Sequence, residues 1–190
     1  MARKKTITRE QILKAAHDVV ATEGFSRFTA RNIANKMKCS TQPIYLEFKN
    51  MDDLKQELYR QIHHYLSVDI FPVVRTGKPL IDLALNYIHF AVNESGLYRA
   101  LYLEYTGAGE EMQKFSYDCF LSMVKKDSSF DHLSEAELIS LHTGTWIVAT
   151  GVASLMTSGL IHLTDEEIEQ LIQNTIDHIL SDDNLVEVNF

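Results

Sequence analysis

Residues 29–48 read TARNIANKMKCSTQPIYLEF and predict two short helices joined by a turn. The first helix, over residues 30–36, buries Ile33, and the second, over residues 41–47, buries Ile44. A hydroxyl residue stands before each helix, where its oxygen can accept a hydrogen bond from a backbone N–H. This size and spacing is typical of a helix-turn-helix, whose second helix enters the major groove of DNA.

The segment before this motif predicts a longer amphipathic helix. One face of residues 9–23 is apolar at helical spacing, and Gly24 then ends the helix. Capping sequences at Thr8, Ser134 and Thr164 mark further helix starts. Sustained alternation of apolar and polar residues is missing from the sequence, so we expect an all-α fold. We predict helices over residues 9–23, 30–36, 41–47, 51–69, 79–94, 97–106, 110–126, 135–158 and 165–181.

The charge of the chain is divided unevenly. Its 190 residues hold 18 Lys and Arg against 26 Asp and Glu, for a net charge of −8. Ten basic and four acidic residues lie within the first 50, which therefore carry +6 and leave −14 to the rest. Such a division indicates a basic contact module on an acidic body, although a chance cluster of solvated Lys and Arg gives the same totals.

A series of residues at fixed spacing runs through the first 54 positions. In order, it consists of Ile12-Leu13-x-Ala15-Ala16, Gly24-Phe25, Thr29-x-Arg31-x-Ile33-Ala34, Ser40, Ile44-Tyr45-x-x-Phe48 and Leu54. This series resembles the tetracycline-repressor (TetR) family of bacterial transcription regulators. The resemblance implies a three-helix DNA-binding domain over residues 1–50 and a larger helical domain for ligand binding and dimerisation over residues 51–190. The second part resembles the family in length and helical character.

Carried over position by position, the family pattern implies a set of DNA-contacting residues. Thr29 caps the first motif helix, Thr41 and Gln42 face the bases, and Tyr45 touches the phosphate backbone. Two alternatives stay open: Thr41 and Gln42 are merely exposed, and Tyr45 packs between helices. The full set is Thr29, Arg31, Lys38, Ser40, Thr41, Gln42, Tyr45 and Lys49.

The chain departs from the family pattern at two positions near the motif. Lys38 stands in the turn where the family usually has glycine, so its backbone must tolerate that turn, and it can add a phosphate contact. Met51 stands where the family often has lysine, and Lys49 is the candidate to replace that lysine. Pro43 falls in the first turn of the second helix, where a missing N–H costs little.

Aromatic residues are concentrated in the acidic part of the chain. Buried Tyr and Trp side chains require hydrogen-bond partners, so an aromatic helical cage with a few polar tips suits a small, largely apolar effector. The alternative for each residue is a place in an ordinary helical core. The expected lining consists of Tyr87, Phe90, Tyr102, Phe120, Met123, His142 and Trp146.

The last two predicted helices carry apolar and small-residue stripes. Paired with their symmetry mates, they would form a four-helix bundle, and this implies a homodimer that can read a palindromic site. The alternative is that both stripes are buried inside one subunit. The expected interface consists of Leu141, Gly144, Val148, Gly151, Val152, Leu155, Ile168, Ile172 and Ile176.

The sequence contains none of the usual catalytic or phosphate-binding motifs. We therefore expect a ligand-responsive regulator, most simply a repressor of a palindromic double-stranded DNA operator, with no cofactor and no resident metal. A helical protein-binding adaptor and a soluble enzyme without a recognisable motif remain the alternatives. A metal sensor would have to use His89, His142 or His162.

The sequence predicts a cytoplasmic protein. Cys39 and Cys119 are too few and too far apart for a disulfide framework, and the basic N-terminus is not followed by an apolar signal core. The stretch 138–164 lacks Asp, Glu, Lys and Arg and is long enough to cross a bilayer. Because Ser, Thr and His interrupt it, we expect a helix that other parts of the protein cover.

Overall fold

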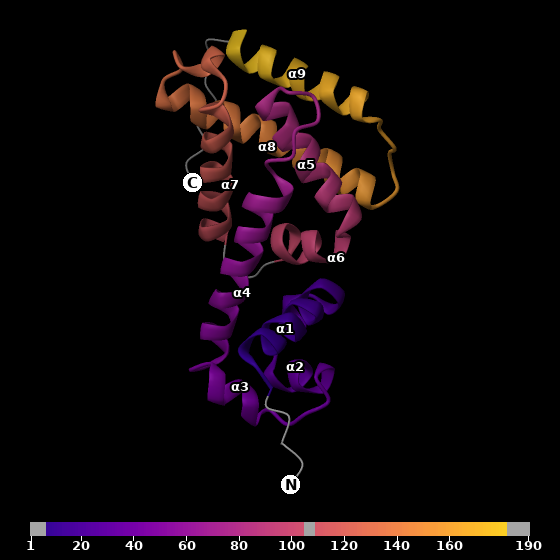
Figure 1. Ribbon diagram of the computed structural model, residues 1–190. Coiled ribbons are helices and arrows are strands. Elements are labelled where there is room, and N and C mark those ends of the chain that lie inside the picture. The colour runs from indigo at the N-terminus through magenta and orange to yellow at the C-terminus, as the bar shows by residue number, and fades with distance from the viewer. Residues whose placement is uncertain (1–6, 105–108, 182–190) are drawn as a thin grey trace. The chain divides into compact units, whose positions relative to one another are not determined.

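The computed structural model describes residues 7–104 and 109–181, and within these ranges all regular structure is helical (Figure 1). Every predicted helix begins within two residues of its expected start. The longer elements are α1 (Arg9–Glu23), α2 (Ala30–Lys36), α3 (Gln42–Glu47), α4 (Met51–Tyr65), α5 (Pro79–Asn93), α6 (Ser95–Tyr98), α7 (Gly109–Val124), α8 (Glu135–Thr157) and α9 (Asp165–Ser181). Shorter turns are η1 (Phe25–Arg27), η2 (Leu66–Ile70), η3 (Arg99–Leu103) and η4 (Ser128–Phe130).

The helix starts follow from the predicted caps. Thr8 accepts a hydrogen bond from the N–H of Gln11, whose side chain accepts one in return from the N–H of Thr8. Ser134 forms the same reciprocal pair with Glu137. Each cap satisfies backbone donors that the first helical turn leaves without partners.

The chain folds into two compact units. The first contains residues up to Tyr65 together with 94–108, and the second contains residues 66–93 and 109 onward. These limits differ from the expected division at residue 50, because α4 and the α6–η3 segment belong with the first three helices. The chain therefore passes between the units three times.

The first unit is built around α1. Its apolar face packs against α2, α3 and α4, and Ile12, Ile33, Ile44 and Leu54 are all fully buried. Each of these positions belongs to the apolar spacing that predicted the motif. Their burial fixes the mutual orientation of the motif helices.

The segment from α6 to η3 also packs on α1, at its C-terminal end. Gly96 lies so close to the last turn of α1 that a Cβ atom there would overlap the carbonyl oxygen of Ala21. Glu104 accepts a hydrogen bond of 3.1 Å from the backbone N–H of Phe25, just after Gly24. Two contacts, one steric and one polar, thus attach this segment to α1 and η1.

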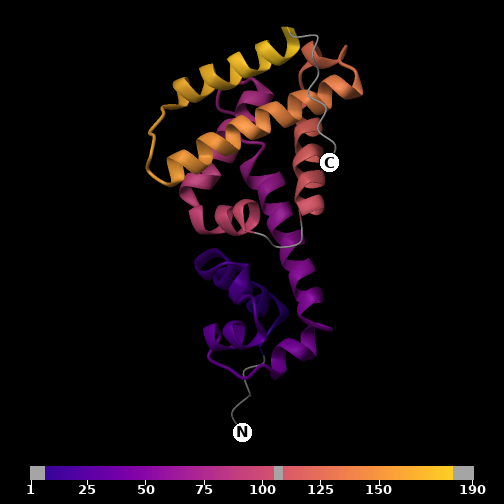
Figure 2. The same cartoon turned by 180° about the vertical axis from the view of Figure 1, so that it is seen from behind.

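The second unit is a layered arrangement of α5, α7, α8 and α9. In Figures 1 and 2, α9 runs alongside α8, and α5 lies against both. Asp82 is buried near the start of α5, and its carboxylate accepts hydrogen bonds from the N–H and hydroxyl of Thr76 and from the N–H of Gly77. By length and composition alone α8 could cross a membrane, a property it shares with core helices of soluble proteins.

The apolar stripes of α8 and α9 are packed largely within one chain. Leu141, Val152, Ile168, Ile172 and Ile176 are buried by the neighbouring helices of the same chain. These five residues therefore have little surface left for a second copy.

Gly144 also serves packing within one chain. A Cβ atom at this position would overlap the side chain of Ile179, so the glycine allows α9 to approach α8 closely. The outward side of α8 holds Ile147, which is 63% exposed, Leu155, which is 42% exposed, and Gly151 between them. Val148 is half-buried beside them.

Candidate functional site

The helix-turn-helix is formed by α2, a turn and α3. Thr29 caps α2, as expected, through a 3.2 Å hydrogen bond from the N–H of Asn32. In the turn, Lys38 adopts a φ of 55°, the left-handed conformation that favours glycine. The helix α3 begins at Gln42, and neither Ser40 nor Thr41 caps it with a side-chain hydrogen bond.

The helix α3 has one buried and one exposed face. Ile44 is fully buried and Phe48, directly after the helix, is 2% exposed. Gln42, Tyr45 and Leu46 lie on the opposite side, since residues three and four positions apart share a helix face. Tyr45 is 56% exposed, so it does not pack between helices within this chain.

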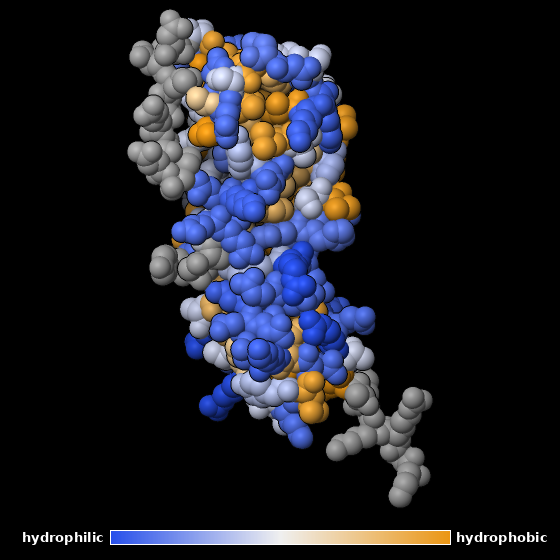
Figure 3. Space-filling view, turned by 90° about the vertical axis from the view of Figure 1, so that its left-hand side faces the viewer, coloured by the Kyte–Doolittle hydropathy of each residue, from blue (hydrophilic) through white to orange (hydrophobic). Residues whose placement is uncertain are grey.

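Leu46 is the residue on this face that sequence reasoning missed. It is 75% exposed, although leucine in a helix usually contributes to a core. The lower part of the molecule in Figure 3 is mostly hydrophilic on the face shown, with small hydrophobic patches. The signal in the sequence was its position one residue after Tyr45 and four after Gln42.

All eight expected DNA-contacting residues lie in the first unit, and each has an exposed or half-exposed side chain. Arg9 was counted among the basic residues of this region, but it has a structural role. It donates hydrogen bonds of 2.9 Å to the carbonyl oxygen of Glu47 and 3.0 Å to the carboxylate of Glu57. Its guanidinium also lies 4.2 Å from the centroid of the Phe48 ring. Arg9 therefore ties the end of α3 to α1 and α4.

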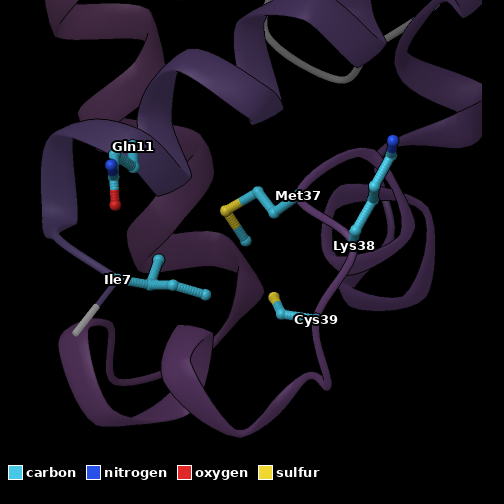
Figure 4. A pocket seen from close by; sticks show the side chains of 5 residues that line it. All are labelled: Ile7, Gln11, Met37, Lys38 and Cys39. Atoms are coloured by element: carbon cyan, nitrogen blue, oxygen red, sulfur yellow. The ribbon is translucent and has the colours of Figure 1, made fainter. Parts of the chain in front are cut away.

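A hollow of about 470 Å³ lies between the start of α1 and the turn. It is lined by Ile7, Gln11, Met37, Lys38 and Cys39. Figure 4 shows the Lys38 side chain extending away from the sulfur atoms of Met37 and Cys39. The Lys38 side chain is exposed.

Comparison with known proteins agrees with this geometry. Residues 12–58, which run from α1 into α4, match the family model for bacterial regulatory proteins of the tetR family. Residues 12–58 therefore form an N-terminal domain of the tetR-family type. No curated protein matches it in sequence.

Solved structures of TetR-like regulators share the fold over most of the chain. A TetR-family protein from Vibrio parahaemolyticus has 17% sequence identity and a TM-score of 0.66, covering 89% of this chain and 96% of its own. A TetR-like regulator from Rhodococcus sp. RHA1 has 19% identity and a TM-score of 0.59, covering 94% and 98%. The fatty acid degradation regulator FadR from Bacillus halodurans has 15% identity and a TM-score of 0.59, covering 96% and 100%.

Replacing Lys38, the turn residue with positive φ, should separate the effect of its backbone on stability from the effect of its charge on DNA binding. We expect Lys38→Gly to raise the free energy of unfolding by about 0.5–1 kcal/mol, because glycine adopts positive φ without a steric penalty. The same change should lower the salt dependence of DNA binding by about 0.9 in log–log slope per protomer if the amine contacts phosphate. Urea unfolding and duplex titration measure the two effects.

The matched control for this change is Lys38→Gln, which keeps the strained backbone and removes the charge. We expect parental stability and the reduced salt slope. Equal stability of the glycine variant and the parent would contradict the assigned strain, and an unchanged slope in both variants would contradict the phosphate contact.

Within the second unit, several expected effector-lining residues form an aromatic cluster. The imidazole of His142 has its centroid 5.2 Å from that of Phe120 and 5.5 Å from that of Trp146. Tyr117 contacts His142 edge-on, and the Ser116 hydroxyl lies 3.1 Å from His142 Nε2. Tyr117 and Ser116 were not predicted for this site.

Two polar atoms beside this cluster are buried without a hydrogen-bond partner among the described residues. They are the indole Nε1 of Trp146 and the hydroxyl of Thr143, which lie about one turn apart on α8. A buried donor without a partner is rare in proteins, because its desolvation costs about 1–3 kcal/mol. These atoms are therefore candidates to bind a polar group of a ligand.

The remaining expected lining residues are Tyr87, Phe90, Met123 and Tyr102. The hydroxyl groups of Tyr87 and Thr150 share a hydrogen bond of 3.1 Å. Phe90 and Met123 are buried. Tyr102 belongs to the first unit, where it stacks on Tyr98 with centroids 5.5 Å apart. A separate hollow of about 250 Å³ in the second unit lies between α5, η4 and α9, and none of the seven expected residues lines it.

Across residues 7–104 and 109–181, no three His, Cys, Asp or Glu side chains gather as metal ligands would. Of the three candidate histidines, His89 pairs with Asp165 at 2.8 Å, His142 lies in the aromatic cluster and His162 is exposed. They occupy three different surroundings.

The stability of the second unit should decrease at acidic pH because His142 is buried. Burial lowers the pKa of His142 from 6.5 to about 4. Between these values the unfolded chain binds a proton that the folded chain does not, so stability falls as pH decreases, by at most about 1.4 kcal/mol per pH unit. We expect His142→Phe to reduce this slope in urea unfolding measured from pH 7 to 4.5. Parallel pH profiles of parent and variant would contradict the assignment.

Proposed function

We propose that this TetR-family chain is a homodimeric repressor that binds a palindromic operator and is released by a small molecule. The observation that supports it most directly is α3, which presents Gln42 and Tyr45 outward on a helix whose other face is fixed by Ile44 and Phe48. Three exposed basic residues of the first unit would contribute positive charge for binding DNA phosphates: Arg31, Lys38 and Lys49. The acidic remainder of the chain disfavours other orientations on DNA.

The dimer would use the outward side of α8. Ile147, Gly151 and Leu155 recur at intervals of four residues on one face, and no heavy atom of the described residues lies within 4 Å of a Cβ placed at Gly151. An apolar stripe around a small residue allows two helices to approach closely. This face retains Gly151 and Leu155 from the sequence prediction and adds Ile147.

A charge on this face should break the proposed dimer. We expect Ile147→Glu to shift the protein from dimer to monomer at micromolar concentration, because a buried unpaired carboxylate is strongly unfavourable. Sedimentation equilibrium measures the mass. The matched control is Val92→Glu, at an exposed apolar position on α5. A dimeric Ile147→Glu protein would refute this interface.

The effector would bind beside the aromatic cluster of the second unit. Phe120, His142 and Trp146 supply apolar surface, and the partnerless Trp146 Nε1 and Thr143 hydroxyl supply polar contacts. A largely apolar molecule with one hydrogen-bond acceptor fits this chemistry. Such a ligand weakens DNA binding only if it prefers the non-binding state of the protein.

The path of the chain offers a route for this regulation. Three residues separate α3 from α4, and α4 continues into the π-helical turn η2, where the chain enters the second unit. π-Helical turns within helices are frequent at functional sites. A ligand-induced shift of α4 would change the separation of two recognition helices that must fit half-sites about 34–36 Å apart.

Selection from a random pool of duplexes tests the proposed function. We expect the purified protein to enrich an inverted repeat whose half-site centres are about one helical turn apart. A protein-binding adaptor or a cytoplasmic enzyme would enrich no sequence. Enrichment of a single, unrepeated site would support DNA binding and refute the symmetric dimer.

A further inference from the structure

The exposed leucine on α3 is not explained by the fold. Leu46 is 75% exposed, while the apolar residues that hold α3 in place, Ile44 and Phe48, are buried on the other side. We propose that Leu46 is a specificity-determining residue that packs against the 5-methyl group of a thymine in the operator. This proposal rests on the proposed DNA-binding function.

The chemistry of the major groove supports this partner. Leucine cannot form a hydrogen bond through its side chain, and the thymine methyl is the apolar group that a base pair presents in the major groove. The segment Gln42–Glu47 contains no Lys or Arg, the residues that most often read guanine. The exposed face of α3 is therefore suited to A·T pairs, with Gln42 able to contact adenine through two hydrogen bonds.

The spacing of the two side chains fits neighbouring base pairs. Gln42 and Leu46 are four residues apart on one helix face, which corresponds to a rise of about 6 Å. Base pairs stack at about 3.4 Å along each strand. We therefore expect the thymine contacted by Leu46 to lie within about two base pairs of the position read by Gln42.

Substitution of single thymines by deoxyuridine tests the contact, because it removes the methyl group alone. The preferred duplex is prepared with each thymine replaced in turn, symmetrically in both half-sites, and titrated with the parent protein and with Leu46→Ala. For the parent we expect one position at which the loss of the methyl weakens binding by about fourfold per half-site. Leu46→Ala should bind the thymine and deoxyuridine duplexes equally at that position.

Leu46→Ala should fold, because the side chain is mostly exposed and alanine favours helix. The matched control is Val74→Ala, an equally exposed apolar residue of the second unit, which should keep the fourfold difference. The proposal is overturned if Leu46→Ala retains that difference, or if the parent binds every deoxyuridine duplex as tightly as the thymine duplex. If no duplex is preferred or bound at all, the DNA-binding function itself is refuted, and the proposal with it.

Discussion

Gly96→Ala should destabilise the chain by about 3 kcal/mol or more, the largest effect expected of a single methyl group in this protein. The added Cβ would overlap the carbonyl oxygen of Ala21, a backbone atom in the last turn of α1 that cannot move aside like a flexible side chain. Relief of the overlap requires α6 to separate from α1. Leu97 and Tyr98, which are buried next to Gly96, would then lose packing as well. Urea unfolding followed by circular dichroism measures the loss.

Gly109→Ala is the matched control for this change. Gly109 begins α7, and none of the described residues comes within 4 Å of a Cβ placed there. Its stability should stay within about 1 kcal/mol of the parent, since alanine is the better helix former. Equal stability of the two alanine variants would show that α6 does not pack tightly on α1.

The second large effect is expected at Gln42. Gln42→Ala should reduce the preference for the selected duplex over one changed at a single base pair per half-site by about tenfold or more, since a two-hydrogen-bond contact contributes about 1–3 kcal/mol of discrimination. Binding to unrelated duplexes should be little changed, because the phosphate contacts remain. Competition titration with the changed duplexes measures this ratio.

Tyr45→Phe provides the contrasting variant on the same face. Removal of the hydroxyl should weaken binding to all duplexes by a similar factor, because a phosphate contact carries no direct sequence information. Both side chains are exposed, so the variants should fold like the parent. If folded Gln42→Ala kept the full sequence preference of the parent, the assigned base contact would be wrong.

Local features of the fold were predictable from the sequence. The apolar spacing around Ile12, Ile33 and Ile44 predicted the motif helices, and the capping pairs at Thr8 and Ser134 placed helix starts that the structure reproduces. These features depend on residues within a few positions of one another, where helix geometry is fixed. The expected TetR-family membership depended on the same local series.

The partners of each apolar face were not predictable in the same way. The stripe containing Ile168 and Ile172 was assigned to a second copy, but α8 and α5 of the same chain cover it. Hydrophobic periodicity shows that a face is buried and does not show which helix buries it. The attachment of Glu104 to Phe25 spans 79 residues and has no local signal.

For Leu46, too, the sequence pattern and the observed burial disagree. Leu46 lies two residues after the buried Ile44 in a short helix, and its hydropathy alone favours the core. Only the observed burial of Ile44 and Phe48 shows that Leu46 lies on the opposite, outward face. A residue that departs from the usual burial pattern is a candidate for function.

The salt dependence of binding to the selected duplex tests the central claim most directly. When the basic N-terminal segment binds phosphates, counterions are released from the DNA. The logarithm of the association constant should therefore fall linearly with the logarithm of salt concentration, with a slope of about −0.9 for each phosphate neutralised. With several basic contacts per protomer, we expect the association constant to fall by about tenfold or more between 50 and 200 mM salt. An association constant that does not change with salt would contradict the account of this chain as a DNA-binding regulator.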